Sequence, residues 1–107
     1  MNTYEEPTRI RVLEEDWIHV KLRSVLNYGE SAQMLGGDMI ASLVAGPLEQ
    51  PLTIPDGPLK HRAVWICLPR EARAAVDKVR KANPDASWSR LLHAAVLKDK
   101  QENHLTA

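Results

Sequence analysis

"RAVWICLP", residues 62–69, is the stretch from which the architecture of the C-terminal half can be worked out. Its side chains alternate between two faces, and this period of two residues predicts a strand. Pro69 then suits the first turn of a helix, where its missing N–H costs nothing. One face of the predicted strand carries Val64, Ile66 and Leu68, and the other carries Ala63, Trp65 and Cys67.

Two helices are predicted to follow this strand. Apolar residues recur at helical spacing in the first, at Ala72, Val76 and Val79. Asn83 and Pro84 end it, because a residue that precedes proline disfavours helical dihedral angles. Ser87 can cap the last helix, whose apolar positions are Trp88, Leu91, Leu92, Ala95 and Val96. Residues 61–100 are therefore predicted to form a strand–helix–helix unit.

The N-terminal half contains two further alternating runs, RIRVL (9–13) and WIHVKLR (17–23), joined by Glu14, Glu15 and Asp16. Two such runs with a short connection predict a β-hairpin. A helix is predicted next, with Asn27 as its N-cap and Glu30 as the carboxylate of a capping box. Its apolar positions are Leu35, Met39 and Leu43, flanked by Ala32, Ile40 and Val44.

Gly36 and Gly37 lie inside this predicted helix. Each costs about 1 kcal/mol relative to alanine in a helix interior. Such a pair indicates a kink or close packing against another backbone.

The chain of 107 residues suits one small domain (1–107) of the α+β class. A hairpin and a helix are expected over 9–45, and the strand–helix–helix unit over 61–100. Residues 46–60 between them contain four prolines and two glycines, which predicts a loop. The small core of such a chain and the unpaired edge of the strand at 62–69 together favour a homo-oligomer.

The formal net charge is zero, but the charges are divided unevenly. Residues 1–59 contain four Lys/Arg and nine Asp/Glu, whereas residues 60–100 contain ten and four. A basic C-terminal half can attract nucleic acid, its own acidic partner half or a second subunit. Cys67 is the only cysteine, which excludes an internal disulfide and favours the cytoplasm. No apolar run approaches the roughly 20 residues that cross a bilayer, and no membrane contact is expected.

No group of residues predicts catalysis or metal binding. The four histidines, His19, His61, His93 and His104, are not spaced as ligands of one metal. There is no phosphate-binding glycine loop, and Cys67 has no acid–base partner near it in the sequence. We therefore expect a protein that is not an enzyme and needs no cofactor.

Residues 61–100 resemble a ribbon–helix–helix DNA-binding module, through VWICLP, the helix after it, a short turn and SWSRLLHAAV. In that family, single strands pair across a dimer and the ribbon enters the major groove. The resemblance implies a dimeric transcriptional regulator or antitoxin, with Ala63, Trp65 and Cys67 toward the groove. These side chains are poorly suited to reading base edges. The expected DNA contacts are therefore Lys60, Arg62, Arg70 and Ser87.

The N-terminal half resembles a different family, the tail assembly chaperones and related small tail proteins of long-tailed bacteriophages. The matching residues are Trp17, Ile18, Val20, Lys21, Leu26, Tyr28, Gly29 and Glu30. This resemblance implies a chaperone-like role in virion tail assembly in the host cytoplasm, with a tape measure or tail tube protein as the partner. Aromatic residues dominate interfaces and methionine adapts to them, so the expected contacts are Trp17, Trp65, Trp88, Met34 and Met39.

The tail-assembly role is the favoured prediction from the sequence. The DNA-binding regulator is the alternative, and a phage-encoded inhibitor of a host protein is a third hypothesis.

Overall fold

The computed structural model describes residues 3–26, 30–48, 52–55 and 57–103. Its elements, in chain order, are β1 (Thr8–Leu13), α1 (Glu14–Leu26), α2 (Ala32–Val44), β2 (His61–Ile66), the short 3-10 helix η1 (Arg70–Ala72), α3 (Arg73–Ala82) and α4 (Trp88–Asn103). The predicted α+β class is confirmed. The order strand–helix–helix occurs twice, first in residues 8–44 and again in residues 61–103.

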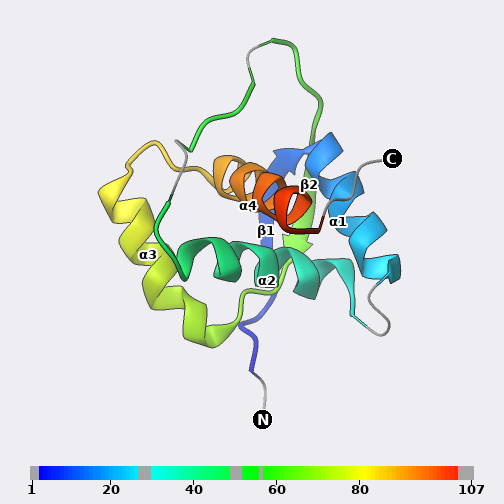
Figure 1. Ribbon diagram of the computed structural model, residues 1–107. Coiled ribbons are helices and arrows are strands. Elements are labelled where there is room, and N and C mark those ends of the chain that lie inside the picture. Colours follow the sequence, from blue (N-terminus) through cyan, green and yellow to red (C-terminus); the bar gives the residue numbers. More distant parts are fainter. Residues whose placement is uncertain (1–2, 27–29, 49–51, 56, 104–107) are drawn as a thin grey trace.

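The two strands form one antiparallel ribbon, to which each half of the chain contributes a strand (Figure 1). The register runs from Thr8 opposite Ile66 to Leu13 opposite His61. The predicted N-terminal β-hairpin is therefore wrong. β1 pairs with the strand of the C-terminal half, and the edge of β2 that was expected to seek a second molecule is occupied by β1.

Residues 17–23, predicted as the second strand of the hairpin, belong to helix α1. Three acidic residues, 14–16, occupy its first turn, where carboxylates interact favourably with the positive end of the helix dipole. Apolar and polar residues do alternate here, but the helix buries His19 and exposes Ile18 and Leu22. The alternation therefore does not correspond to an inner and an outer face.

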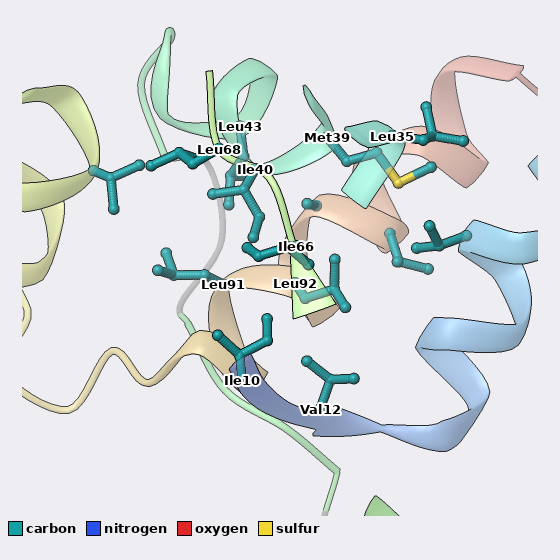
Figure 2. Packing of buried hydrophobic residues seen from close by; sticks show 14 of the residues in the cluster. Ile10, Val12, Leu35, Met39, Ile40, Leu43, Ile66, Leu68, Leu91 and Leu92 are labelled. Carbon is teal, nitrogen blue, oxygen red and sulfur yellow. The ribbon is translucent and has the colours of Figure 1, made fainter. Parts of the chain in front are cut away.

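Helices α2 and α4 lie over one face of the ribbon, and α1 and α3 lie on opposite sides of this pair (Figure 1). The ribbon turns Ile10, Val12, Val64 and Ile66 toward the helices, and each of the four is at most 5% exposed. Figure 2 shows ribbon residues meeting leucine side chains of α2 and α4. Burying one side chain of this size contributes about 1.5–3 kcal/mol, so this layer is the main contact between the two halves.

Each half packs its second helix on the strand of the other half. Helix α4 contacts β1, helix α2 contacts β2, and the two second helices contact each other. Helix α1 lies against both α2 and α4, and α3 lies against α2, so each first helix also reaches the second helix of the other half. Interchanging the halves leaves most of this pattern unchanged, so the domain has an approximate internal two-fold symmetry.

Helix α2 follows the predicted apolar spacing. The hydroxyl of Ser31 caps it by accepting a hydrogen bond from the backbone N–H of Met34 at 3.2 Å. The predicted N-cap Asn27 lies outside the described residues. Gly37 faces the end of β2 so closely that a Cβ atom there would overlap the carbonyl group of Cys67. Close packing against another backbone, one of the two interpretations of the glycine pair, is confirmed at Gly37.

The predicted strand and helices of the C-terminal half are confirmed. The turn η1 follows Pro69, and Asn83 is the C-cap of α3. The hydroxyl of Ser87 accepts a hydrogen bond from the backbone N–H of Arg90 at 3.2 Å, as expected for a cap of α4. Among the described residues, no helix combines the length and the apolar character that crossing a membrane requires.

Candidate nucleic-acid interface

The face of the ribbon that points away from the helices carries four exposed side chains. In β1 they are Arg9 and Arg11, and in β2 they are Ala63 and Trp65. Arg9 lies opposite Trp65, and Arg11 lies opposite Ala63. Alternate residues of a strand point to opposite faces, so the pattern that buries one set places these four together. Trp65 is 49% exposed, which is unusual for so large an apolar side chain.

The charges within the two strands are all positive, whereas the exposed Glu6 and Glu15 lie just beyond the ends of β1. Neither strand contains Asp or Glu. Lys60 and Arg62 are exposed at the start of β2, where the alternation places Arg62 on the side of Val64, away from Arg9 and Arg11. Within the described part of the chain, no side-chain hydrogen bond or ion pair engages Arg9 or Arg11. Their guanidinium groups are therefore available to an external acceptor, and the planar fork of donors matches a phosphate or the edge of guanine.

Three of the four residues predicted to contact DNA lie at the ends of β2, and the fourth lies at the start of α4. Lys60 and Arg62 are exposed at the beginning of β2. Arg70 is exposed in η1, beyond the other end, and its backbone N–H donates to the carbonyl of Thr3 at 2.9 Å. Ser87 is exposed and caps α4. Cys67, which the resemblance directs toward the groove, is half-buried next to α2.

Sequence reasoning missed Arg9 and Arg11. The signal is present in residues 9–13, because the alternation there separates both arginines from the buried Ile10 and Val12. The predicted hairpin conceals it, since that pairing gives residues 9–13 a different neighbour and leaves β2 without a partner in the same chain.

The residues predicted to contact a protein partner have different surroundings. Trp17 and Met39 are each 6% exposed and belong to the core. Trp88 packs against the edge of the core, with the guanidinium of an arginine of α3 5.0 Å from the centre of its ring. Met34 is half-buried. Trp65 is therefore the member of this set that an approaching molecule meets first.

A separate surface feature lies on the outer side of helix α1. Ile18, Leu22, Val25 and Leu26, which we call the α1 stripe, are between 52% and 74% exposed. The first three follow one another at intervals of four and three residues, and Leu26 is adjacent to Val25. This spacing places them on one side of the helix. Contiguous exposed apolar residues of this kind mark sites of protein contact.

The inner side of α1 holds α4 through two histidine–aspartate contacts. The carboxylate of Asp16 lies 3.1 Å from Nδ1 of His93. Nε2 of His19 lies 2.7 Å from Oδ2 of Asp99. Burial raises the pKa of Asp16, and the hydrogen bond with His93 opposes part of that effect. The described residues include no group of three or more His, Cys, Asp or Glu side chains that could hold a metal ion.

Comparisons of the chain with protein-family models, with curated proteins and with solved structures return no match. The functional proposals below therefore rest on the residues and their geometry.

Proposed function

We propose that the protein binds double-stranded DNA with the outer face of the β1–β2 ribbon. The observation that carries the proposal is the position of Arg9 and Arg11 on that face, opposite Trp65 and Ala63. The major groove of B-DNA admits a two-stranded β-ribbon, and arginine is the side chain that most often contacts guanine there, through two parallel hydrogen bonds. The ribbon therefore offers a suitable shape and suitable donors.

The fold supports this function in a form that differs from the dimer implied by the ribbon–helix–helix resemblance. That resemblance covers only residues 61–100 and takes its second strand from another molecule. Here residues 8–44 supply a second strand and two more helices within the same chain. The groove-facing surface is also no longer limited to Ala63 and Trp65, because β1 adds two arginines.

The charge around the ribbon supports the same function. Arg9 and Arg11 place two positive charges on the outer face, and Lys60 is exposed just before β2. Each phosphate that a protein neutralises releases counterions, so the logarithm of the affinity falls with that of the salt concentration by about 0.9 per contact. A fourfold rise in salt therefore lowers the affinity about 3- to 4-fold for each phosphate contact.

The test is the binding of the purified full chain to a fluorescent duplex, followed by anisotropy from about 50 to about 200 mM salt, the range over which such contacts weaken strongly. The variant Arg9→Ala/Arg11→Ala is expected to lose most of the affinity. Lys78→Ala/Lys81→Ala removes the same charge from exposed positions of α3 and is the matched control. Equal affinities of the two folded variants, or no binding by the parent chain, would contradict the proposal.

A second candidate is the tail-assembly role, in which the chain binds a helical structural protein as a chaperone. The α1 stripe favours it, because an amphipathic partner helix can lay its apolar face along such a row. The stripe also lies within residues 17–30, the segment that resembles the tail proteins. This function and DNA binding use different surfaces, so each can be tested without disturbing the other.

Co-expression with a tape measure protein from the same genome tests the second candidate. The partner's soluble fraction is expected to rise with the parent chain and to fall back with Leu22→Glu, which places a charge in the α1 stripe. Ala74→Glu adds the same charge at an exposed position of α3 and is the control. An effect on solubility that Leu22→Glu leaves intact would count against this role.

A further inference from the structure

The two strands of the ribbon carry different side chains at positions related by the internal two-fold. The internal two-fold relates Arg9 to Ala63 and Arg11 to Trp65. With this correspondence, buried residues of β1 fall on buried residues of β2, and the pair formed by Arg9 and Trp65 is mapped onto the pair formed by Ala63 and Arg11. The two-fold axis then passes through the pair formed by Ile10 and Val64. In a dimer of identical chains, equivalent positions carry the same residue. Here each arginine of β1 corresponds to an uncharged residue of β2.

We infer that one copy of this chain recognises a non-palindromic DNA element, in which guanines face Arg9 and Arg11 and thymines face Ala63 and Trp65. This inference rests on the proposed DNA-binding function and adds the kind of sequence that is bound. A palindrome presents the same base edges to both strands of a ribbon. A ribbon with arginines on only one strand's outer face cannot contact both halves of a palindrome in the same way.

The assignment of bases follows from the chemistry of the major groove. Guanine presents two acceptors, N7 and O6, which match the two parallel donors of an arginine. Thymine presents a methyl group, the apolar feature of the groove, which is contacted by small or aromatic apolar side chains. Ala63 offers only carbon, and Trp65 offers carbon surface with one N–H donor, so thymine, which presents a methyl group and the acceptor O4, is the base that they fit best.

The spacing of the guanines follows from the geometry of the strand. Arg9 and Arg11 leave the same face two residues apart, and an antiparallel strand rises about 3.4 Å per residue, which separates them by about 6.8 Å. Charges along one DNA strand are about 3.4 Å apart, so this distance corresponds to about two base pairs. The inferred element therefore contains two guanines about two base pairs apart.

The experiment selects duplexes from a random pool with the purified full chain and measures how many copies bind the enriched element by native mass spectrometry. We expect a non-palindromic element bound by one copy. Arg9→Ala and Arg11→Ala should each relax the preference at one guanine and lower the affinity by about 5- to 150-fold, whereas Lys78→Ala should not. Replacing the thymine that faces Trp65 with uracil removes only the methyl group, and the effect of this replacement should disappear in Trp65→Ala.

The other outcomes separate this inference from the function on which it rests. A palindromic element bound by two copies overturns the inference and agrees with the proposed function. Binding of all duplexes with equal affinity also overturns the inference, because it shows contact with phosphates alone. A folded chain that binds no duplex overturns both.

Discussion

Replacing Gly37 with alanine is expected to destabilise the protein, whereas replacing its neighbour Gly36 is not. Both lie in α2, where exchanging glycine for alanine stabilises an unconstrained helix by about 1 kcal/mol. A Cβ atom at Gly36 would lie 3.4 Å from a methyl carbon of Ile66, close to an ordinary contact. A Cβ atom at Gly37 would overlap the carbonyl group of Cys67 and lie 3.1 Å from the Cα atom of Leu68.

The size of the effect follows from what must move. A backbone cannot rotate away as a side chain does, so α2 and the end of β2 have to separate. Overpacking of this kind costs about 1–3 kcal/mol. Separation also removes the hydrogen bond from the N–H of Cys67 to the carbonyl of Gln33 at 3.0 Å, which contributes about 1 kcal/mol. After the gain in helix propensity, Gly37→Ala should lower the free energy of unfolding by about 2 kcal/mol.

Urea denaturation followed by circular dichroism measures this quantity for the parent and both variants. A loss of about 2 kcal/mol in a domain of this size corresponds to a melting temperature about 10 °C lower. Gly36→Ala should be as stable as the parent or up to about 1 kcal/mol more stable. Equal stability of the two variants would refute the reasoning. Helix propensity predicts the same change for both glycines, so any difference in stability has to come from the contact of Gly37 with Cys67.

Three further changes test other contacts of the fold. Burial raises the pKa of Asp16 above 3.8, so its contribution to stability is present below pH 3.8 and is lost as the pH rises through the raised pKa. The melting temperature of the parent relative to Asp16→Asn should therefore fall over that range, and parallel pH curves would contradict this. The hydrogen bond from Arg73 lowers the pKa of Glu5 below 4.5, so the stability that this pair contributes is present above pH 4.5 and is lost as the pH falls through the lowered pKa. Glu5→Gln should lower the melting temperature at neutral pH, and this difference should shrink as the pH falls through the lowered pKa of Glu5. Leu91→Ala in the core should cost about 2–5 kcal/mol in urea denaturation, whereas Val25→Ala in the α1 stripe should cost less than about 0.5 kcal/mol.

The C-terminal half could be predicted because its signals are local. The alternation before Pro69, the stop at Asn83 and the cap at Ser87 each depend on residues within a few positions of each other. The structure has an element boundary at or beside each of these points. The sequence therefore defines strand, helix and helix in residues 61–100 without reference to the rest of the molecule.

Helix α1 could not be predicted in this way, because its inner face is chosen by a distant partner. His19 and Asp16 are polar, yet they are buried against Asp99 and His93 of α4. Its apolar Leu22, in contrast, faces outward. A prediction that places apolar residues inside reads this helix incorrectly, since the long-range pairs that compensate the burial are not visible in the local sequence.

The candidate interface could be predicted only in part, because some of its residues depend on local signals and others on a long-range contact. Lys60 and Arg62 belong to the half that was correctly interpreted, one just before β2 and the other within it. Arg9 and Arg11 depend on the pairing of β1 with β2, two strands that α1, α2 and the connection after Val44 separate along the chain. A register between distant strands is set by tertiary packing, which a sequence reveals only through the match of buried faces.

The connection between Val44 and His61 has a consequence for how the ribbon responds to dilution. Because β1 and β2 belong to one chain, they pair at an effective concentration that no dilution of the protein changes. A ribbon built from two molecules separates as their concentration falls below the dissociation constant of the pair. In this chain the face that carries Arg9 and Trp65 stays assembled even at a few copies per cell. A single codon change also alters one position of the ribbon, whereas it would alter two in a pair of identical chains.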